Sequence, residues 1–204
     1  MNSILYTIGH SNHEIAIFIS LLREHGITAL GDVRSHPYSR HVPQYSRESL
    51  KAALSDADIA YIFLGKELGA RSGNPDDYRL GKVQYDRLSQ RPSFCEGVKR
   101  VIQGMEHYRI ALMCAEKDPL DCHRALLVAR KFFETGIPVN HIHADSFLET
   151  QQKFESRLLT LCKLPEGNMF KNRAEFIAEA YAMQSERVAY YNETMEHPQR
   201  VAAP

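Results

Sequence analysis

Residues 109–130 combine two cysteines, a histidine and several charged side chains between two apolar runs. Residues 110–113 predict a buried strand, residues 114–120 a tight polar loop, and Asp121 the start of a helix. Loops that carry polar groups on a rigid scaffold are where function usually lies. We therefore take this stretch as the first candidate for a functional site.

Cys122 has the sequence context of a reactive thiol. With Asp121 as N-cap, Cys122 would lie in the first helical turn, where unpaired N–H groups and the helix dipole favour a thiolate. His123 and Arg124 would lower the thiol pKa further, whereas the neighbouring aspartates oppose them. We interpret Cys122 as a nucleophile or ligand contact, with a half-buried structural cysteine as the alternative. Cys114 ends a core strand, which favours a structural role, and it stays a second candidate.

A metal site is another interpretation of the same residues. Cys114, Cys122 and His123, with His10 or His36, could supply thiolate and imidazole ligands for zinc. However, the spacing Cys-x7-Cys-His matches no familiar zinc pattern. Neighbouring side chains on a helix also point about 100° apart. The sequence therefore predicts no metal site, and it identifies no cofactor.

The composition limits the class of protein. Lys+Arg and Asp+Glu are balanced at 25 each, so no global charge drives the chain onto nucleic acid or an anionic membrane. The four cysteines lack the spacing of a disulfide framework, which favours reduced thiols. No apolar run approaches the roughly 18 residues of a membrane span, and the first residues lack the features of a signal peptide. We expect a cytoplasmic protein without a membrane partner.

Short apolar runs alternate with helical periodicity along most of the chain. The runs that predict strands are residues 5–8, 27–33, 60–64, 110–113 and 139–142. Such alternation is typical of repeated βαβ units. It predicts an α/β fold of three layers, α/β/α, with a mainly parallel sheet of about five strands.

Two irregular stretches and a helical tail complete the predicted organisation. Residues 36–45 and 66–84 show no periodicity and predict loops, the second long enough to be functional or mobile. Helical patterns continue through residues 147–164 and 173–191. We therefore expect an α/β domain over residues 1–146 and a C-terminal helical extension over residues 147–204, packed on the domain or on a partner.

Polar side chains follow every predicted strand at its carboxyl end, the edge where open parallel sheets bind ligands. These side chains are His10, Ser11, Asn12, Asp32, Arg34, Ser35, His36, Arg71, Cys114, Glu116, Lys117, Asp118, Cys122, His123, Arg124, Asp145 and Ser146. Their convergence predicts a composite pocket at this edge of the sheet.

The cations of these loops favour an anionic ligand. Arg34, Arg40, Arg71, Lys117 and Arg124 could hold phosphate or carboxylate, and pairing with local acids is the alternative. Neither a phosphate-loop lysine motif nor Gly-x-Gly-x-x-Gly occurs, which disfavours ordinary ATP or dinucleotide binding. The chain also lacks a phosphatase-like Cys-x5-Arg loop after Cys114 and a Gly-x-Ser-x-Gly elbow.

Several motifs also resemble one known family. They are Thr7-Ile8-Gly9-His10-Ser11-Asn12, Asp32-Val33-Arg34-Ser35, Pro37-x-Ser39-Arg40, Tyr61-x-x-Leu64-Gly65-x-x-Leu68-Gly69 and the run from Cys114 to Arg124. In this order, over about residues 5–145, they resemble the bacterial and archaeal domain of unknown function 488. Ala70 stands where this resemblance leads us to expect glycine. The resemblance implies a cytoplasmic α/β domain and supplies no activity.

We expect an enzyme, or an enzyme-derived domain, that binds a small anionic ligand such as a nucleotide or modified base. Cys122 or Cys114 would be nucleophile or ligand, and His10 or Asp32 acid or base. The residues expected to bind the ligand are Ser11, Asn12, Arg34, Ser35, Arg40, Lys117, Asp118, His123 and Arg124.

A second interpretation is a non-catalytic nucleic-acid-binding or regulatory module. Tyr38, Tyr45, Tyr78 and Tyr85 in or beside the two irregular stretches would then stack on bases. The balanced charge disfavours tight nonspecific binding, although a local basic patch is compatible with it. The C-terminal helices could also form a homo-oligomer.

Overall fold

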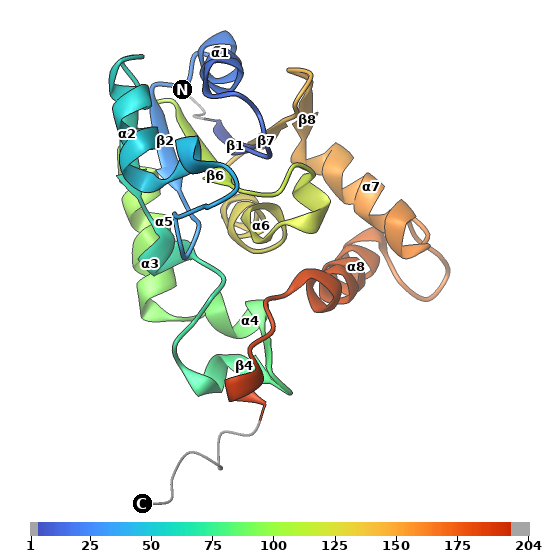
Figure 1. Ribbon diagram of the computed structural model, residues 1–204. Helices are drawn as coiled ribbons and strands as arrows, with labels where there is room; N and C mark the ends of the chain where they lie inside the picture. Colours follow the sequence, from blue (N-terminus) through green and yellow to red (C-terminus); the bar gives the residue numbers. More distant parts are fainter. Residues whose placement is uncertain (1–3, 197–204) are drawn as a thin grey trace, which may run out of the picture.

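The computed structural model describes residues 4–196, and a six-stranded sheet lies at its centre (Figure 1). The sheet consists of β1 (Leu5–Gly9), β2 (Ala29–Asp32), β3 (Ala60–Phe63), β6 (Ile110–Cys114), β7 (Val139–Ile142) and β8 (Leu148–Thr150). Its strand order is β3-β2-β6-β1-β7-β8. Every pair is parallel except β7 with β8. The predicted mainly parallel sheet is confirmed, with one strand more than expected.

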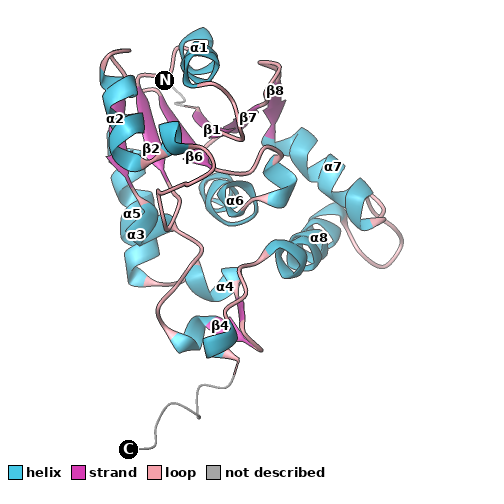
Figure 2. Cartoon of the chain, viewed as in Figure 1, coloured by secondary structure: helices cyan, strands magenta, loops and turns pink. Residues whose placement is uncertain are grey.

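Helices cover both faces of this sheet (Figure 2). On one face α1 (Ile15–Glu24) and α2 (Arg47–Ser55) contribute to an apolar cluster that includes Tyr6 and Ile8 of β1. On the other face α5 (Pro92–Gly104), α6 (Arg130–Glu134) and α7 (Gln151–Cys162) share a cluster with Leu5. Alternate residues of β1 face opposite sides because the side-chain period of a strand is two. The three-layer α/β/α prediction is therefore confirmed.

The segment that was predicted to be an irregular loop over residues 66–84 contains regular structure. It holds most of the short helix α3 (Gly65–Leu68) and a hairpin of β4 (Tyr78–Arg79) and β5 (Lys82–Val83), which α4 (Tyr85–Leu88) follows. Short 3-10 turns lie at η1 (Pro43–Tyr45), η2 (Pro75–Asp77), η3 (Pro119–Asp121) and η5 (Glu193–Met195). The hairpin strands are two residues long, too short to produce a visible alternation in the sequence.

The helix after β6 begins later than predicted. Asp118 accepts a hydrogen bond from the Leu120 amide and thereby starts the turn η3, which ends at Asp121. Cys122 is then extended, with φ −136° and ψ 136°. The helix continues from His123 through the π-helical stretch η4 (Arg124–Ala129) into α6. Asp121 is therefore not the N-cap, and Cys122 lies directly before the helix.

The pattern over residues 147–164 also begins differently from the prediction, because β8 precedes α7. Ser146, with a left-handed φ of 67°, turns the chain back on itself, and β8 then pairs with β7. A strand of three residues next to a helix gives too short a pattern to be separated from it.

The C-terminal helices join the core of the α/β domain. Phe154 and Leu158 of α7 and Tyr181 of α8 (Arg173–Val188) are buried in the same cluster as α5 and α6. After α8 the chain returns to the β4–β5 hairpin, where the Val83 amide donates to the Tyr190 carbonyl at 3.0 Å. The last part of the expected extension, residues 197–204, lies outside the described residues. None of the described helices combines the length and apolar character that crossing a membrane requires.

Candidate functional site

A cavity of about 530 Å³ lies at the carboxyl edge of the sheet. Its walls are loops that follow β1, β2, β3 and β6, together with the first residue of α4, the last residue of α8 and Tyr190 beyond it. The lining residues include His10, Ser11, Asn12, Arg34, Ser35, His36, Tyr38, Arg71, Tyr85, Cys114, Glu116, Asp121, His123, Val188 and Tyr190. Because β2, β6 and β1 are adjacent and parallel, their carboxyl ends deliver these loops to one place.

Gly9 allows the loops after β1 and β6 to approach closely. A Cβ atom at Gly9 would lie 1.9 Å from the Glu116 carbonyl oxygen, a distance that no side chain can occupy. The guanidinium of Arg124 stabilises the loop after β6, because it donates to the carbonyls of Glu116 at 2.7 Å and Lys117 at 3.1 Å. Arg124 is fully buried, so its guanidinium positions backbone and does not reach the cavity.

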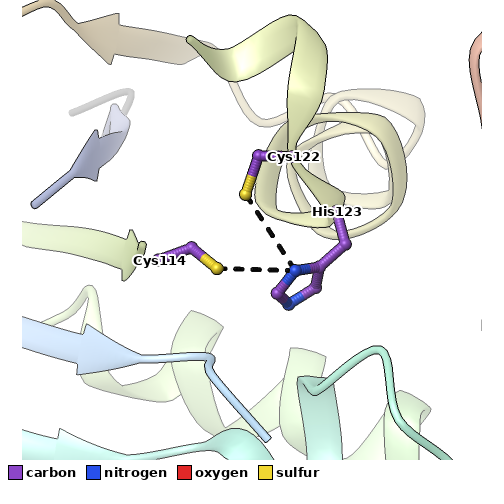
Figure 3. Close-up of side chains that lie close together, drawn as sticks. All are labelled: Cys114, Cys122 and His123. Atoms are coloured by element: carbon purple, nitrogen blue, oxygen red, sulfur yellow. Dashed lines mark hydrogen bonds between the residues drawn. The ribbon is translucent and has the colours of Figure 1, made fainter. Parts of the chain in front are cut away.

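Cys114, Cys122 and His123 form a thiol–imidazole cluster beside the cavity (Figure 3). Nδ1 of His123 lies 3.5 Å from Sγ of Cys114 and 4.0 Å from Sγ of Cys122. Both cysteines are buried, and 9% of the His123 surface is exposed. Cys114 and His123 line the cavity, whereas Cys122 is not part of the lining.

The extended conformation of Cys122 makes its side chain a cap for the following helix. Sγ accepts a hydrogen bond from the Arg124 amide at 3.4 Å, and the Cys122 carbonyl accepts from the amides of Ala125 and Leu126. Burial alone would raise the pKa of the thiol, but the hydrogen bond from Cys114 and the charge of Arg124 bring that pKa well below its usual value. A helix N-terminus does lie beside Cys122, as the sequence predicts. Cys122 precedes the first helical turn, however, and is not part of it.

Cys114 and Glu116 hold protons more strongly than usual. Burial raises the pKa of the Cys114 thiol, and the hydrogen bond to Cys122 raises it further. Burial and the charge of Cys122 likewise raise the pKa of Glu116, whose Oε2 lies 2.8 Å from the Cys122 sulfur. The cluster thus favours a thiolate at Cys122 with protonated neighbours.

The two ring nitrogens of His123 have different partners: Nε2 contacts a backbone carbonyl, and Nδ1 faces the two sulfurs. Nε2 lies 3.1 Å from the Val33 carbonyl oxygen, which accepts a hydrogen bond and requires the proton on Nε2. Nδ1 is therefore the nitrogen that exchanges a proton with its surroundings. Burial lowers the pKa of this imidazole, but the hydrogen bond to Cys122 and its charge outweigh burial and raise the pKa.

Asp32, Arg34, His10, Tyr45 and Tyr61 form a largely buried network, from which His10 and Arg34 reach the cavity lining. Arg34 donates to both carboxylate oxygens of Asp32, at 2.9 and 2.6 Å, and to the Tyr45 carbonyl at 2.9 Å. The Tyr61 hydroxyl donates to the same carboxylate at 2.9 Å. Asp32 is fully buried and Arg34 nearly so, which makes this ion pair a support for the site.

His10 is held by the buried network on all sides. Its Nδ1 donates to the Ser11 carbonyl at 2.8 Å, its Nε2 accepts from Arg34 at 3.2 Å, and its ring stacks on Tyr45 at 4.1 Å. Burial and the charge of Arg34 lower the pKa of His10 to about 4. Both nitrogens are occupied in a neutral ring, which suits a positioning role better than acid–base chemistry.

Arg71 is the exposed arginine of the cavity. Its guanidinium lies 4.5 Å above the ring of Tyr190, and its amide donates to the Ser35 hydroxyl at 3.0 Å. No carboxylate of residues 4–196 forms an ion pair with it. We call Arg71, Tyr190 and the exposed Tyr38 the rim of the cavity.

The remaining residues that the sequence predicts to bind the ligand differ in their position relative to the cavity. Ser11, Asn12 and Ser35 line the cavity. Arg40 and Lys117 are exposed outside its lining. Asp118 caps η3 and forms a two-pronged ion pair with Arg157 at 2.7 and 3.0 Å, which occupies its carboxylate.

Two wall residues carry no local signal in the sequence. Val188 and Tyr190 come from the far end of the chain, and only the tertiary fold brings them to the carboxyl edge, so no spacing rule could have found them. Tyr85, which the sequence offered only as a base-stacking residue, begins a helix of one turn and also lines the cavity. Burial raises the pKa of Tyr85, and the neighbouring thiols add to this effect.

Fold and site together define an α/β domain with a polar cavity at the carboxyl edge of a mainly parallel sheet. The sequence profile of one family, Domain of unknown function DUF488, matches residues 14–130, which is more than half of the 204 residues. The chain therefore belongs to the DUF488 family, as its motifs predicted. No curated protein and no solved structure matches the chain.

Proposed function

We propose that the cavity binds a small planar anion, such as a nucleotide or a modified base, and presents it to the thiol–imidazole cluster. The observation that carries this proposal is Arg71, an exposed cation of the rim that stacks on Tyr190. Arg71 forms no ion pair with a carboxylate of the described residues, 4–196, and such an arginine is suited to phosphate or carboxylate, which it can bind with two parallel hydrogen bonds.

The shape and lining of the cavity support the same ligand class. Its volume of about 530 Å³ lies within the range of roughly 300–1,000 Å³ that small-molecule sites occupy. Tyr190 lies under the Arg71 guanidinium, and Tyr38, with 81% of its surface exposed, is an aromatic residue of the same lining. Aromatic rings next to a cation suit a planar ring that carries a negative group.

The cavity lining also includes reactive groups. Cys114, Glu116 and His123 line the cavity, and Cys122, outside the lining, contacts Glu116 and His123. Glu116 and His123 each lie within hydrogen-bond distance of the Cys122 sulfur, and from the cavity wall they can exchange protons with a bound ligand. We infer an enzyme, in which the rim binds the anion and this wall performs the chemistry.

The alternative of a nucleic-acid-binding module has less support. Of the four tyrosines expected to stack on bases, Tyr45, Tyr78 and Tyr85 are buried, and only Tyr38 is exposed. A stacking surface for a single strand needs several accessible rings. This interpretation stays a prediction.

Thermal-shift titration with nucleotides, nucleosides, free bases and inorganic phosphate tests the proposal. We expect stabilisation by a phosphorylated nucleotide, and Arg71→Ala should weaken its binding about 10- to 100-fold because a charged hydrogen bond is lost. Arg40→Ala is the matched control, since Arg40 is exposed nearby but outside the lining. Equal ligand affinity in the Arg71→Ala variant, or the larger loss at Arg40, would contradict the proposal.

A further inference from the structure

The three atoms of the thiol–imidazole cluster converge on one point between them. Sγ of Cys114, Sγ of Cys122 and Nδ1 of His123 all lie within 4.8 Å of one another. A sulfur and a nitrogen that share a tetrahedral zinc ion are about 3.5 Å apart, given bond lengths of about 2.3 and 2.0 Å. The two sulfur–nitrogen distances, 3.5 and 4.0 Å, are close to that separation. Small side-chain adjustments would bring all three atoms to one ion.

The orientation of His123 also suits a ligand. A metal-binding histidine usually donates its second ring N–H to a carboxylate or a backbone carbonyl, which fixes the tautomer. Here Nε2 donates to the Val33 carbonyl, so a neutral ring presents the lone pair of Nδ1 to the two sulfurs (Figure 3). The supporting bond that the ligand needs is therefore already present.

Charge favours a cation at this position. Both thiols are buried, and two buried thiolates would repel each other without a counter-ion. A divalent cation balances two thiolates, and its binding releases the thiol protons to solvent. The Arg124 amide already donates to the sulfur of Cys122, which helps to hold that sulfur in its deprotonated form.

We propose that Cys114, Cys122 and His123 bind a single thiophilic divalent cation, zinc by preference, at the wall of the cavity. Soft thiolate ligands combined with imidazole select zinc over magnesium or calcium. Three protein ligands leave the fourth position of a tetrahedral ion for water or substrate, the arrangement of catalytic zinc. That position faces the cavity, because Cys114 and His123 line it.

Glu116 is not among the ligands. Its Oε2 lies 2.8 Å from the Cys122 sulfur, shorter than the separation of about 3.5 Å between an oxygen and a sulfur bound to one zinc ion. The distance fits a hydrogen bond to the Cys122 sulfur. Glu116 therefore lies beside the metal, where its carboxylate can exchange a proton with the occupant of the fourth position.

Cobalt(II) titration of the reduced, chelator-treated full chain tests the site. Wild type should bind a single cobalt ion, with the near-ultraviolet charge-transfer absorption of a thiolate ligand, and zinc should displace it. Cys114→Ser, Cys122→Ser and His123→Ala should each lose binding at concentrations that saturate wild type. Cys95→Ser and Cys162→Ser are matched controls and should bind normally, because neither residue belongs to the cluster.

Two further variants separate this site from its surroundings. Glu116→Gln should keep the cobalt spectrum and weaken binding by no more than about tenfold, as expected of a residue beside the ligands. Arg71→Ala should bind the metal normally even where it no longer binds nucleotide. The metal site and the ligand proposal can therefore fail independently.

If the cysteine variants do not fold, the wild-type spectrum still tests the metal site. Folded, reduced wild type that shows no thiolate absorption with cobalt would overturn the proposal. A Cys114–Cys122 disulfide that forms in air, seen as a loss of two hydrogens by mass spectrometry, would also overturn it if the reduced chain binds no metal. Normal cobalt binding by folded Cys122→Ser would contradict the proposed set of three metal ligands.

Discussion

The buried network and the rim lie at the same edge of the sheet, and both contain an arginine. Arg34 of the network is almost completely buried and makes hydrogen bonds to Asp32, Tyr45 and His10. Arg71 of the rim is exposed and stacks on Tyr190. Burial and saturated hydrogen bonds distinguish Arg34 from Arg71. Under the proposed function, Arg34 supports the site and Arg71 binds the ligand.

Replacement of Arg34 should produce the largest loss of stability. Arg34→Ala leaves the carboxylate of Asp32 buried and unpaired, which costs about 3–5 kcal/mol. Chemical denaturation of Arg34→Ala and Arg71→Ala gives the comparison, and Arg71→Ala should stay within about 0.5 kcal/mol of wild type. A small effect at Arg34 would mean that the buried network does not support the site.

Replacement of Gly9 should have the next largest effect. The new methyl group of Gly9→Ala would meet the Glu116 carbonyl at 1.9 Å, so the backbone of β1 or of the loop must move. We expect a loss of about 3 kcal/mol, the upper end of the range for overpacking. Gly73→Ala is the control, because no atom lies within 4 Å of its new methyl group. Equal melting temperatures for the two variants would contradict the close approach.

Mild acid should destabilise the folded protein because it favours protonation of His141. This residue lies in β7, on the other side of the central strands from Asp32 and Arg34 of the buried network. Burial and the charge of Arg124 lower the pKa of this fully buried imidazole to about 3. In the unfolded chain the pKa is about 6.5, so stability is complete above pH 6.5 and is lost as the pH falls toward 3. At pH 5 the loss from His141 alone is about 2 kcal/mol relative to pH 7.

Urea denaturation at pH 7 and pH 5 measures this effect. His141→Gln should lose about 2 kcal/mol less than wild type between the two pH values, whereas exposed His107→Gln should match wild type. The pKa of His10 is lowered to about 4, so His10 also makes the folded protein less stable as the pH falls. It accounts for the pH dependence that remains in His141→Gln. The same pH dependence in all three proteins would contradict a neutral buried His141.

The sequence predicted the sheet and the edge at which the cavity lies because both depend on local patterns. Apolar runs that alternate with helical periodicity are enough to identify βαβ units, and the carboxyl ends of parallel strands must meet. β8 and the β4–β5 hairpin escaped prediction because strands of two or three residues leave no readable alternation. The rim was predicted only in part, since Tyr190 reaches Arg71 through the tertiary fold.

The sequence predicted no metal site partly because it placed Cys122 and His123 on one helix, where their side chains would diverge. That placement is wrong. Asp118 accepts from the Leu120 amide at the start of η3, Cys122 is extended, and its Sγ lies 4.0 Å from Nδ1 of His123. The absence of a metal itself stays a prediction, which the cobalt titration tests.

The difference between network and rim can be measured in one paired experiment. Melting temperatures of wild type, Arg34→Ala and Arg71→Ala are recorded with and without the best phosphorylated ligand of the nucleotide titration. We expect Arg71→Ala to melt like wild type and to lose the shift caused by the ligand, whereas Arg34→Ala should melt lower before any ligand is added. A full ligand shift in Arg71→Ala, or an unchanged melting temperature in Arg34→Ala, would contradict the division between binding and support.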